Sequence, residues 1–109
     1  MIGQLARLLG AFAVATAAWA QTTPVAHEIR AHVACAEGKS IDAIFVDATA
    51  SSVRLTLSDG RKLSLPQARS GSGARYANGD ESFVFWNKGN TAFVEEGGKT
   101  TYADCVTPR

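Results

Sequence analysis

Two stretches of strict apolar and polar alternation, on either side of one turn signal, constrain the fold more than any other feature of this chain. Residues 53–58 and 62–65 each alternate apolar with polar side chains. A period of two gives a strand one dry and one wet face. Asp59-Gly60 separates the two stretches, and this pair is typical of a type I′ turn. We therefore predict an antiparallel hairpin here.

Similar short runs predict six further strands, and no segment after residue 20 shows a sustained helical period. The runs cover residues 27–35, 41–46, 74–76, 83–87, 91–94 and 100–105. The later turns are short enough to make neighbouring strands antiparallel, and they lie at Asn78-Gly79, Gly89-Asn90 and Gly97-Gly98. We expect an all-β fold of eight antiparallel strands, closed as a small barrel or a sharply twisted sheet, because closure removes exposed edges. A β-sandwich is the alternative.

The first twenty residues have the pattern of a signal peptide. Arg7 precedes an apolar run that ends at Ala18, and Ala18 and Ala20 are small residues of the kind that signal peptidase accepts. We predict cleavage after Ala20, which leaves residues 21–109 as one exported domain. The alternative, a membrane anchor, needs about 20 apolar residues, and this run is shorter. No cysteine follows the run to accept a lipid, so we expect no membrane attachment after cleavage.

Charge gives no reason to expect nucleic acid or an anionic membrane as partner. Removing residues 1–20 takes away Arg7 and no acid, which leaves ten Lys plus Arg against ten Asp plus Glu. A neutral surface of mixed charges does not attract polyanions over long range.

Cys35 and Cys105 are the two cysteines of the chain. An even number of cysteines in an exported protein predicts a disulfide, which would close a loop of 71 residues, counting both ends. The loop-entropy account gives such a bond about 4 kcal/mol, which matters in a domain this small. Metal binding and thiol catalysis are the alternatives. Both are disfavoured, because no CxxC spacing is present and two ligands do not make a zinc site.

Residues that could support catalysis are few and scattered. His27 and His32 are the only histidines, and a separation of five on one strand places them on opposite faces, so they are poor candidates for a shared metal. A nucleophilic Ser72 would need a nearby base, and these histidines are distant and no nucleophile elbow is present. Two pairs of adjacent carboxylates lie beside turns, Asp80-Glu81 and Glu95-Glu96. We interpret them as solvated turn charges without a general acid/base role.

Two segments are harder to explain by packing alone. Residues 69–76 read Arg-Ser-Gly-Ser-Gly-Ala-Arg-Tyr, where glycines leave the serine hydroxyls exposed with little around them. Residues 83–89 form an aromatic strand that ends in a single lysine, Lys88, before its turn. A plain serine-glycine loop and a solvated turn lysine are the simpler explanations. The aromatic residues Phe83, Phe85, Trp86 and Phe93 are interpreted as core and barrel-end packing.

Together, the two segments resemble the signatures of the inhibitors of c-type lysozyme, a family of periplasmic and membrane-bound proteins of Gram-negative bacteria. The Ser-Gly-x-x-Tyr motif is present as Ser72, Gly73 and Tyr76. The Tyr-x-x-x-Thr-Lys-Gly motif is retained at Lys88 and Gly89, with Phe83 in place of tyrosine and Asn87 in place of threonine. The resemblance extends over the whole of residues 21–109, including both cysteines.

This resemblance implies a periplasmic eight-stranded barrel that binds c-type lysozyme and is not an enzyme, with no cofactor or metal. Lys88 would place its ammonium against the catalytic carboxylates of the lysozyme, and Ser72 would hydrogen-bond to one of them. Arg75 and Tyr76 would fix the loop or touch the rim.

The competing hypothesis is a periplasmic barrel that holds a small apolar ligand. Chain length argues against it, because the inward side chains of so small a barrel should pack shut. The sequence does not separate a monomer from a homodimer.

Overall fold

The computed structural model describes residues 27–47 and 51–107, which form eight strands and one short 3₁₀ turn. The strands are β1 (His27–Ala34), β2 (Ser40–Asp47), β3 (Ser52–Leu57), β4 (Lys62–Ala68), β5 (Ala74–Ala77), β6 (Phe83–Lys88), β7 (Thr91–Glu96) and β8 (Lys99–Val106), and the turn is η1 (Ala36–Gly38). All eight predicted strands are present. The predicted signal peptide lies outside the described residues. Within these residues no helix is long and apolar enough to cross a membrane.

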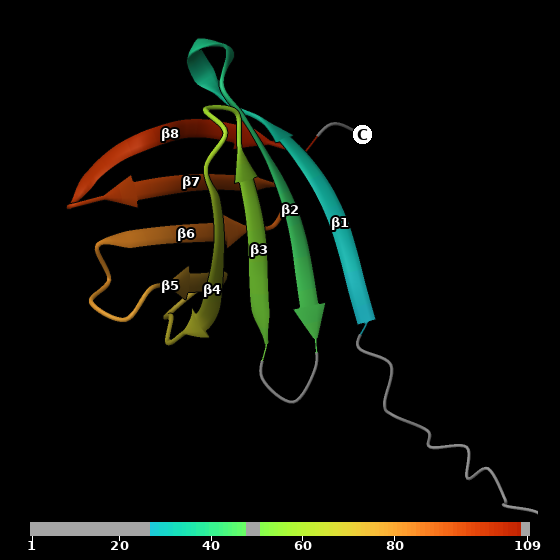
Figure 1. Cartoon of the computed structure of the whole chain (residues 1–109), viewed down its shortest axis with the longest axis vertical. Helices are drawn as coiled ribbons and strands as arrows, with labels where there is room; N and C mark the ends of the chain where they lie inside the picture. Colours follow the sequence, from blue (N-terminus) through green and yellow to red (C-terminus); the bar gives the residue numbers. More distant parts are fainter. Residues whose placement is uncertain (1–26, 48–50, 108–109) are drawn as a thin grey trace, which may run out of the picture.

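The strands follow one another in chain order around a closed antiparallel barrel. β1 to β4 run lengthwise in Figure 1, whereas β6 to β8 run across it, so the barrel consists of two half-sheets. Two narrow seams join them. At the first seam, only two pairs of residues align β4 with β5. At the second seam, β1 and β8 are paired only at Ala34 and Val106. The predicted barrel is confirmed, and its closure depends on these seams.

The hairpin of β3 and β4 is confirmed, but the predicted type I′ turn is wrong. The loop has three residues, because Leu57 N–H donates to Arg61 O at 2.9 Å and Gly60 N–H donates to Leu57 O at 2.8 Å. Gly60 has a φ of 97°, whereas Asp59 is not among the residues with positive φ. A type I turn that ends in one left-handed residue, here Gly60, is the usual form of a three-residue hairpin loop. Both glycines of Gly97-Gly98 have positive φ instead, as a type I′ turn requires.

The core lies inside the barrel and comes from both half-sheets. Phe85, Ile41 and Leu55 are at most 1% exposed. Other buried members of the core include Val33, Val53, Leu57, Leu65, Tyr76, Phe83, Val94, Tyr102 and Cys105. The rings of Phe45, Tyr76 and Phe85 lie 5.8 to 6.3 Å apart between centroids and fill the interior between β2 and β6. Alternate residues on these strands point outward, as the sequence pattern predicts.

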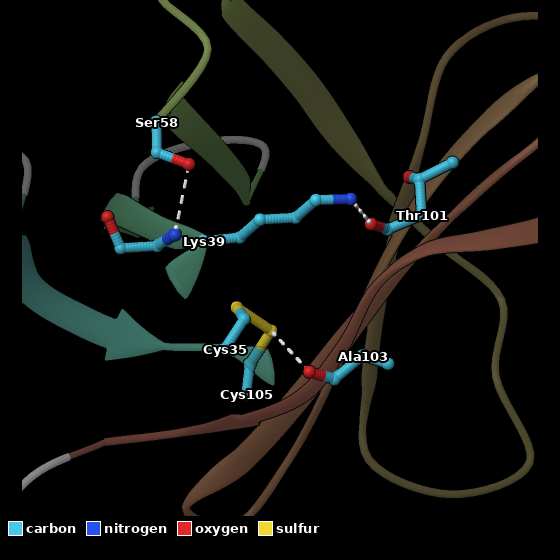
Figure 2. The surroundings of a disulfide bond; sticks show 7 residues. Cys35, Lys39, Ser58, Thr101, Ala103 and Cys105 are labelled. Carbon is cyan, nitrogen blue, oxygen red and sulfur yellow. Dashed lines mark hydrogen bonds between the residues drawn. A yellow bond between two sulfur atoms is a disulfide. The ribbon is translucent and has the colours of Figure 1, made fainter. Parts of the chain in front are cut away.

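The predicted disulfide between Cys35 and Cys105 is present, with an S–S distance of 2.04 Å. It lies at the narrow seam between β1 and β8, as Figure 2 shows. Beside the disulfide, the Lys39 ammonium donates to Thr101 O at 2.7 Å. Ser40 N–H, at the start of β2, donates to Ser58 Oγ in the turn after β3 at 3.0 Å. The bridge therefore connects the first and the last strand where few backbone hydrogen bonds do so.

Candidate functional site

The connection between β4 and β5, residues 69–73, is called the serine loop here. The Ser70 hydroxyl organises it, because Ser70 Oγ accepts from Ser72 N–H at 3.2 Å and donates to Ser72 O. Ser72 itself is exposed, and within residues 27–47 and 51–107 its own hydroxyl has no hydrogen-bond partner. The loop thus holds its backbone in place while the Ser72 hydroxyl remains available.

The turn between β6 and β7, residues 88–91, is called the lysine turn here. Lys88 and Thr91 are paired across it, and Gly89 has a φ of 61°. The Thr91 hydroxyl donates to Lys88 O at 2.8 Å. Lys88 is exposed and stands at the end of a strand whose preceding residues are anchored in the core. The backbone below the lysine is therefore well supported.

The serine loop packs directly against the strand that carries Lys88. Gly73 has a φ of 68°, and a Cβ at this position would lie 2.6 Å from Asn87 O and 2.8 Å from Lys88 Cγ. A carbon atom cannot approach that closely, so glycine is required where the two segments meet. The next residue, Ala74, is in register with Asn87. The structure therefore brings the two sequence motifs together in one site.

Trp86 links the same two segments from the outer wall of the barrel. Its indole Nε1–H donates to Ser72 O at 2.9 Å, and its ring stacks on Phe93 at 5.7 Å between centroids. The interpretation as packing holds for Phe83 and Phe85, which are in the core. Trp86 and Phe93 do pack, on each other, but they lie outside the core cluster and are half-buried. Sequence reasoning missed Trp86 as a site residue.

The cations at this site differ in how they are compensated. Arg75 forms an ion pair with Glu81 and lies over the Trp86 ring at 5.6 Å. The Lys88 ammonium lies over the same ring at 4.8 Å, and it forms no ion pair with any carboxylate of the described residues. An aromatic face attracts a cation but does not neutralise it. The Lys88 ammonium therefore remains available to an external partner.

Tyr76 occupies the core and not the surface. It is 6% exposed and packs against Phe45 and Phe85. Burial raises the pKa of its phenol, with a smaller contribution from the charge of Asp47. Tyr76 is thus placed to anchor the strand that follows the serine loop, and its burial leaves little surface for direct contact at a rim.

The described residues offer no constellation for catalysis or metal binding. Within the part of the chain that the structure covers, no three His, Cys, Asp or Glu side chains lie close enough together to hold a metal ion. His32 pairs with Asp42 at 2.6 Å, on strands β1 and β2. Both histidines lie on β1, which β2 and β3 separate from β4, so their strand does not adjoin the serine loop.

The adjacent carboxylates are held more firmly than the sequence suggested. Glu96 accepts two hydrogen bonds from Arg61, at 2.7 and 3.0 Å, and the Arg61 contacts are the largest reason why the pKa of Glu96 is lowered. Asp80 Oδ1 accepts from Ser82 N–H at 3.0 Å, and hydrogen bonds from Ser82 lower the pKa of Asp80. Asp80 and Glu81 are exposed, as the interpretation as solvated turn charges requires. The interpretation is incomplete for Glu96, which Arg61 ties to another part of the barrel.

Two open grooves lie on the barrel wall and not in its interior. One, of about 580 Å³, runs along β7 and β8 beside Phe93 and Asp104, and the other, of about 520 Å³, crosses β1 to β3 beside His32 and Ile44. Core side chains fill the space between the half-sheets. The geometry gives no support to the hypothesis that the barrel encloses a small apolar ligand.

Comparison with known proteins shows the family of the chain. A family model described as membrane-bound lysozyme-inhibitor of c-type lysozyme matches residues 33–102, which include both the serine loop and the lysine turn. The chain belongs to this family. Its members are inhibitors of lysozyme and not enzymes.

One curated relative and one solved structure illustrate the family. A membrane-bound lysozyme inhibitor of C-type lysozyme from Yersinia enterocolitica is 53% identical over 47 residues, which cover 43% of this chain and 38% of the relative. The crystal structure of Pseudomonas aeruginosa MliC in complex with hen egg white lysozyme superposes with a TM-score of 0.58 at 22% identity, covering 88% of this chain and all of that one. The second likeness is one of fold.

Proposed function

We propose that this protein inhibits c-type lysozyme by inserting the serine loop and the lysine turn into the active-site cleft. The observation that carries the proposal is the Lys88 ammonium. It is exposed, forms no ion pair with a described carboxylate, and stands beside the Ser72 loop on a rigid strand. The family to which the chain belongs supports a lysozyme as the target.

The residue types suit the chemistry of that target. A c-type lysozyme works with two carboxyl groups, one protonated as general acid and one ionised. An ammonium group with three donors satisfies carboxylates in a partly dry groove, and a hydroxyl donates to a carboxylate or accepts from a carboxylic acid. Lys88 and Ser72 together would occupy both catalytic groups and block the cleft. No bond in the inhibitor needs to be cleaved.

The decisive experiment is a titration of residues 21–109 against lysozymes of the hen, goose and invertebrate types. Inhibition confined to the hen type is expected, and equal inhibition of all three would contradict the proposed target.

Substitution of Lys88 tests the mechanism. Removing one member of a buried charge pair at an interface typically costs about 2–5 kcal/mol. Lys88→Ala should therefore weaken inhibition more than tenfold while the melting temperature stays unchanged. Ser72→Ala should cost less, because a neutral donor contributes less than a charged one. Lys62→Ala is the matched control, since this exposed lysine begins β4 at the end remote from the serine loop. A Lys88→Ala variant that inhibits like the parent would refute the mechanism.

We also propose that the protein reaches the periplasm after cleavage at Ala20 and is not lipidated. The absence of a cysteine between the apolar run and Cys35 supports this proposal. Expression of the full chain in a Gram-negative host should release by osmotic shock a protein whose mass corresponds to a start at Gln21. Recovery in the membrane fraction would contradict it.

A further inference from the structure

The indole of Trp86 contacts the serine loop and both cations of the site at once. Its Nε1–H donates to the carbonyl of Ser72, and its ring lies 4.8 Å from the Lys88 ammonium and 5.6 Å from the Arg75 guanidinium. Phe93 supports the ring by stacking at an interplanar angle of 26°. Because Trp86 lies outside the core cluster, these contacts are not a by-product of filling the interior.

We propose that Trp86 is a positioning residue, which orders the Lys88 side chain and fixes the serine loop relative to it before the target binds. This inference rests on the proposed function of the same site. It goes further by assigning the relative placement of the two loops to one aromatic side chain. Trp86 is not one of the residues of the two motifs.

The ordering follows from the flexibility of lysine. A free lysine side chain rotates about four bonds and loses this freedom when its ammonium is held by a partner. The negative face of an indole attracts an ammonium and narrows the range of positions it samples. A side chain that is ordered in the free protein loses less entropy on binding. Trp86 should therefore strengthen inhibition through Lys88, without touching the carboxylates itself.

The hydrogen bond from Nε1 serves the second loop. Ser72 O is its acceptor, and the Ser70 hydroxyl donates to the same oxygen. Gly73, the next residue, packs on Asn87 and Lys88 of the strand that carries Trp86. The indole and the glycine thus hold the serine loop from two sides.

A double-mutant cycle tests the inference. Inhibition constants are measured for residues 21–109 as the parent, Trp86→Ala, Lys88→Ala and the double variant. Trp86→Ala should weaken inhibition about tenfold in the parent and by a clearly smaller factor, about threefold, when Lys88 is already alanine, because only the hold of Trp86 on the serine loop then remains to be lost. Ile44→Ala is the matched control, since Ile44 is also half-buried and lies on β2, in the other half-sheet. It should inhibit like the parent.

A conservative variant and an NMR signal separate positioning from loss of folding. Trp86→Phe keeps a ring under Lys88 but loses the donor to Ser72, so its inhibition should lie between parent and Trp86→Ala. Trp86 is the only tryptophan after residue 20, so residues 21–109 give a single indole N–H resonance. Its exchange with solvent should be slow in the parent and faster in Gly73→Ala, which displaces the serine loop.

The outcomes separate the two proposals. If Lys88→Ala and Ser72→Ala inhibit like the parent, the proposed function of the site fails. If these variants inhibit more weakly than the parent, the proposed function stands, and Trp86→Ala then tests the positioning role alone. That role fails if Trp86→Ala inhibits as well as the parent or better. It also fails if Trp86→Ala weakens inhibition by the same factor in the parent and in Lys88→Ala. If Trp86→Ala does not fold, Trp86→Phe and the indole exchange rate decide.

Discussion

At the scale of single residues, Gly73 governs how closely the serine loop approaches Lys88. Its left-handed backbone disfavours a side chain, and the space around it excludes one, since a Cβ would lie 2.6 Å from Asn87 O. Gly73→Ala should weaken inhibition about tenfold or more, because the loop must move away from the lysine. It should also lower the free energy of unfolding by about 1–2 kcal/mol. Inhibition assays and urea unfolding of residues 21–109 measure both effects.

Gly71 in the same loop provides the control for Gly73. A Cβ there would meet nothing within 4 Å, and its φ is not in the left-handed region. Gly71→Ala should therefore leave the unfolding midpoint and the inhibition close to those of the parent. If both alanine variants behave alike, the contact of Gly73 with β6 is not what sets the loop position.

Single residues were also where sequence reasoning was incomplete. Ser72 and Lys88 could be singled out, because each departs from what strand packing requires. Trp86 could not, because an aromatic residue in a strand is equally compatible with the core. Its role depends on the register of β5 with β6, which aligns Arg75 with Trp86 and Ala74 with Asn87. That register follows from the whole barrel and not from local spacing.

At the scale of elements, the β3–β4 hairpin is tied to β7 by an ion pair between Arg61 and Glu96. Arg61 makes two hydrogen bonds to Glu96, a third to Asp59, and lies over the Phe83 ring. Thr101 adds a hydrogen bond to Glu96 at 2.7 Å. These contacts lower the pKa of Glu96 below its ordinary value of 4.5. The two half-sheets are thus connected by charge as well as by the two seams.

Acid should therefore loosen the barrel at this connection. Because the pKa of Glu96 is lower in the folded than in the unfolded protein, its contribution to stability is present above pH 4.5 and is lost as the pH falls through the folded value. Arg61→Gln should reduce the free energy of unfolding by about 1 kcal/mol at pH 6, since solvent partly screens the half-exposed arginine. The difference should shrink as the pH falls below 4.5 and Glu96 takes up a proton in the folded protein. Urea unfolding across this range measures it, and a constant difference would contradict the assignment.

Strands were easier to predict than the irregularities that connect and bend them. Period-two patterns gave all eight strands, because side-chain alternation is a local property. Tyr102 and Cys105 are three residues apart and should face opposite sides, yet both are buried. The reason is a bulge in which Ala103 and Asp104 lie opposite the single residue Phe93, and Asp104 has a φ of 52°. A bulge depends on the partner strand, so the sequence of β8 alone does not reveal it.

At the scale of the whole molecule, the two seams between the half-sheets differ in what they carry. β4 to β7 with their connections carry the candidate site, whereas β1 and β8 meet at one register pair and depend on the disulfide for closure. Antiparallel neighbours and the advantage of closing edges predicted a barrel. The weakness of one seam could not be predicted, because it depends on where β1 and β8 end relative to each other.

Reduction of the disulfide should consequently affect stability far more than the contact with the target. Cys35 and Cys105 are 70 residues apart in sequence, and opening so long a loop should cost up to about 4 kcal/mol of unfolding free energy. The double variant Cys35→Ser, Cys105→Ser should melt at a much lower temperature than the parent. At a temperature where circular dichroism shows it to be folded, it should still inhibit within a few-fold of the parent, because the contacts that hold the serine loop against Lys88 come from Gly73 and Trp86 and not from the bridge. A folded variant that does not inhibit would show instead that the bridge shapes the site directly.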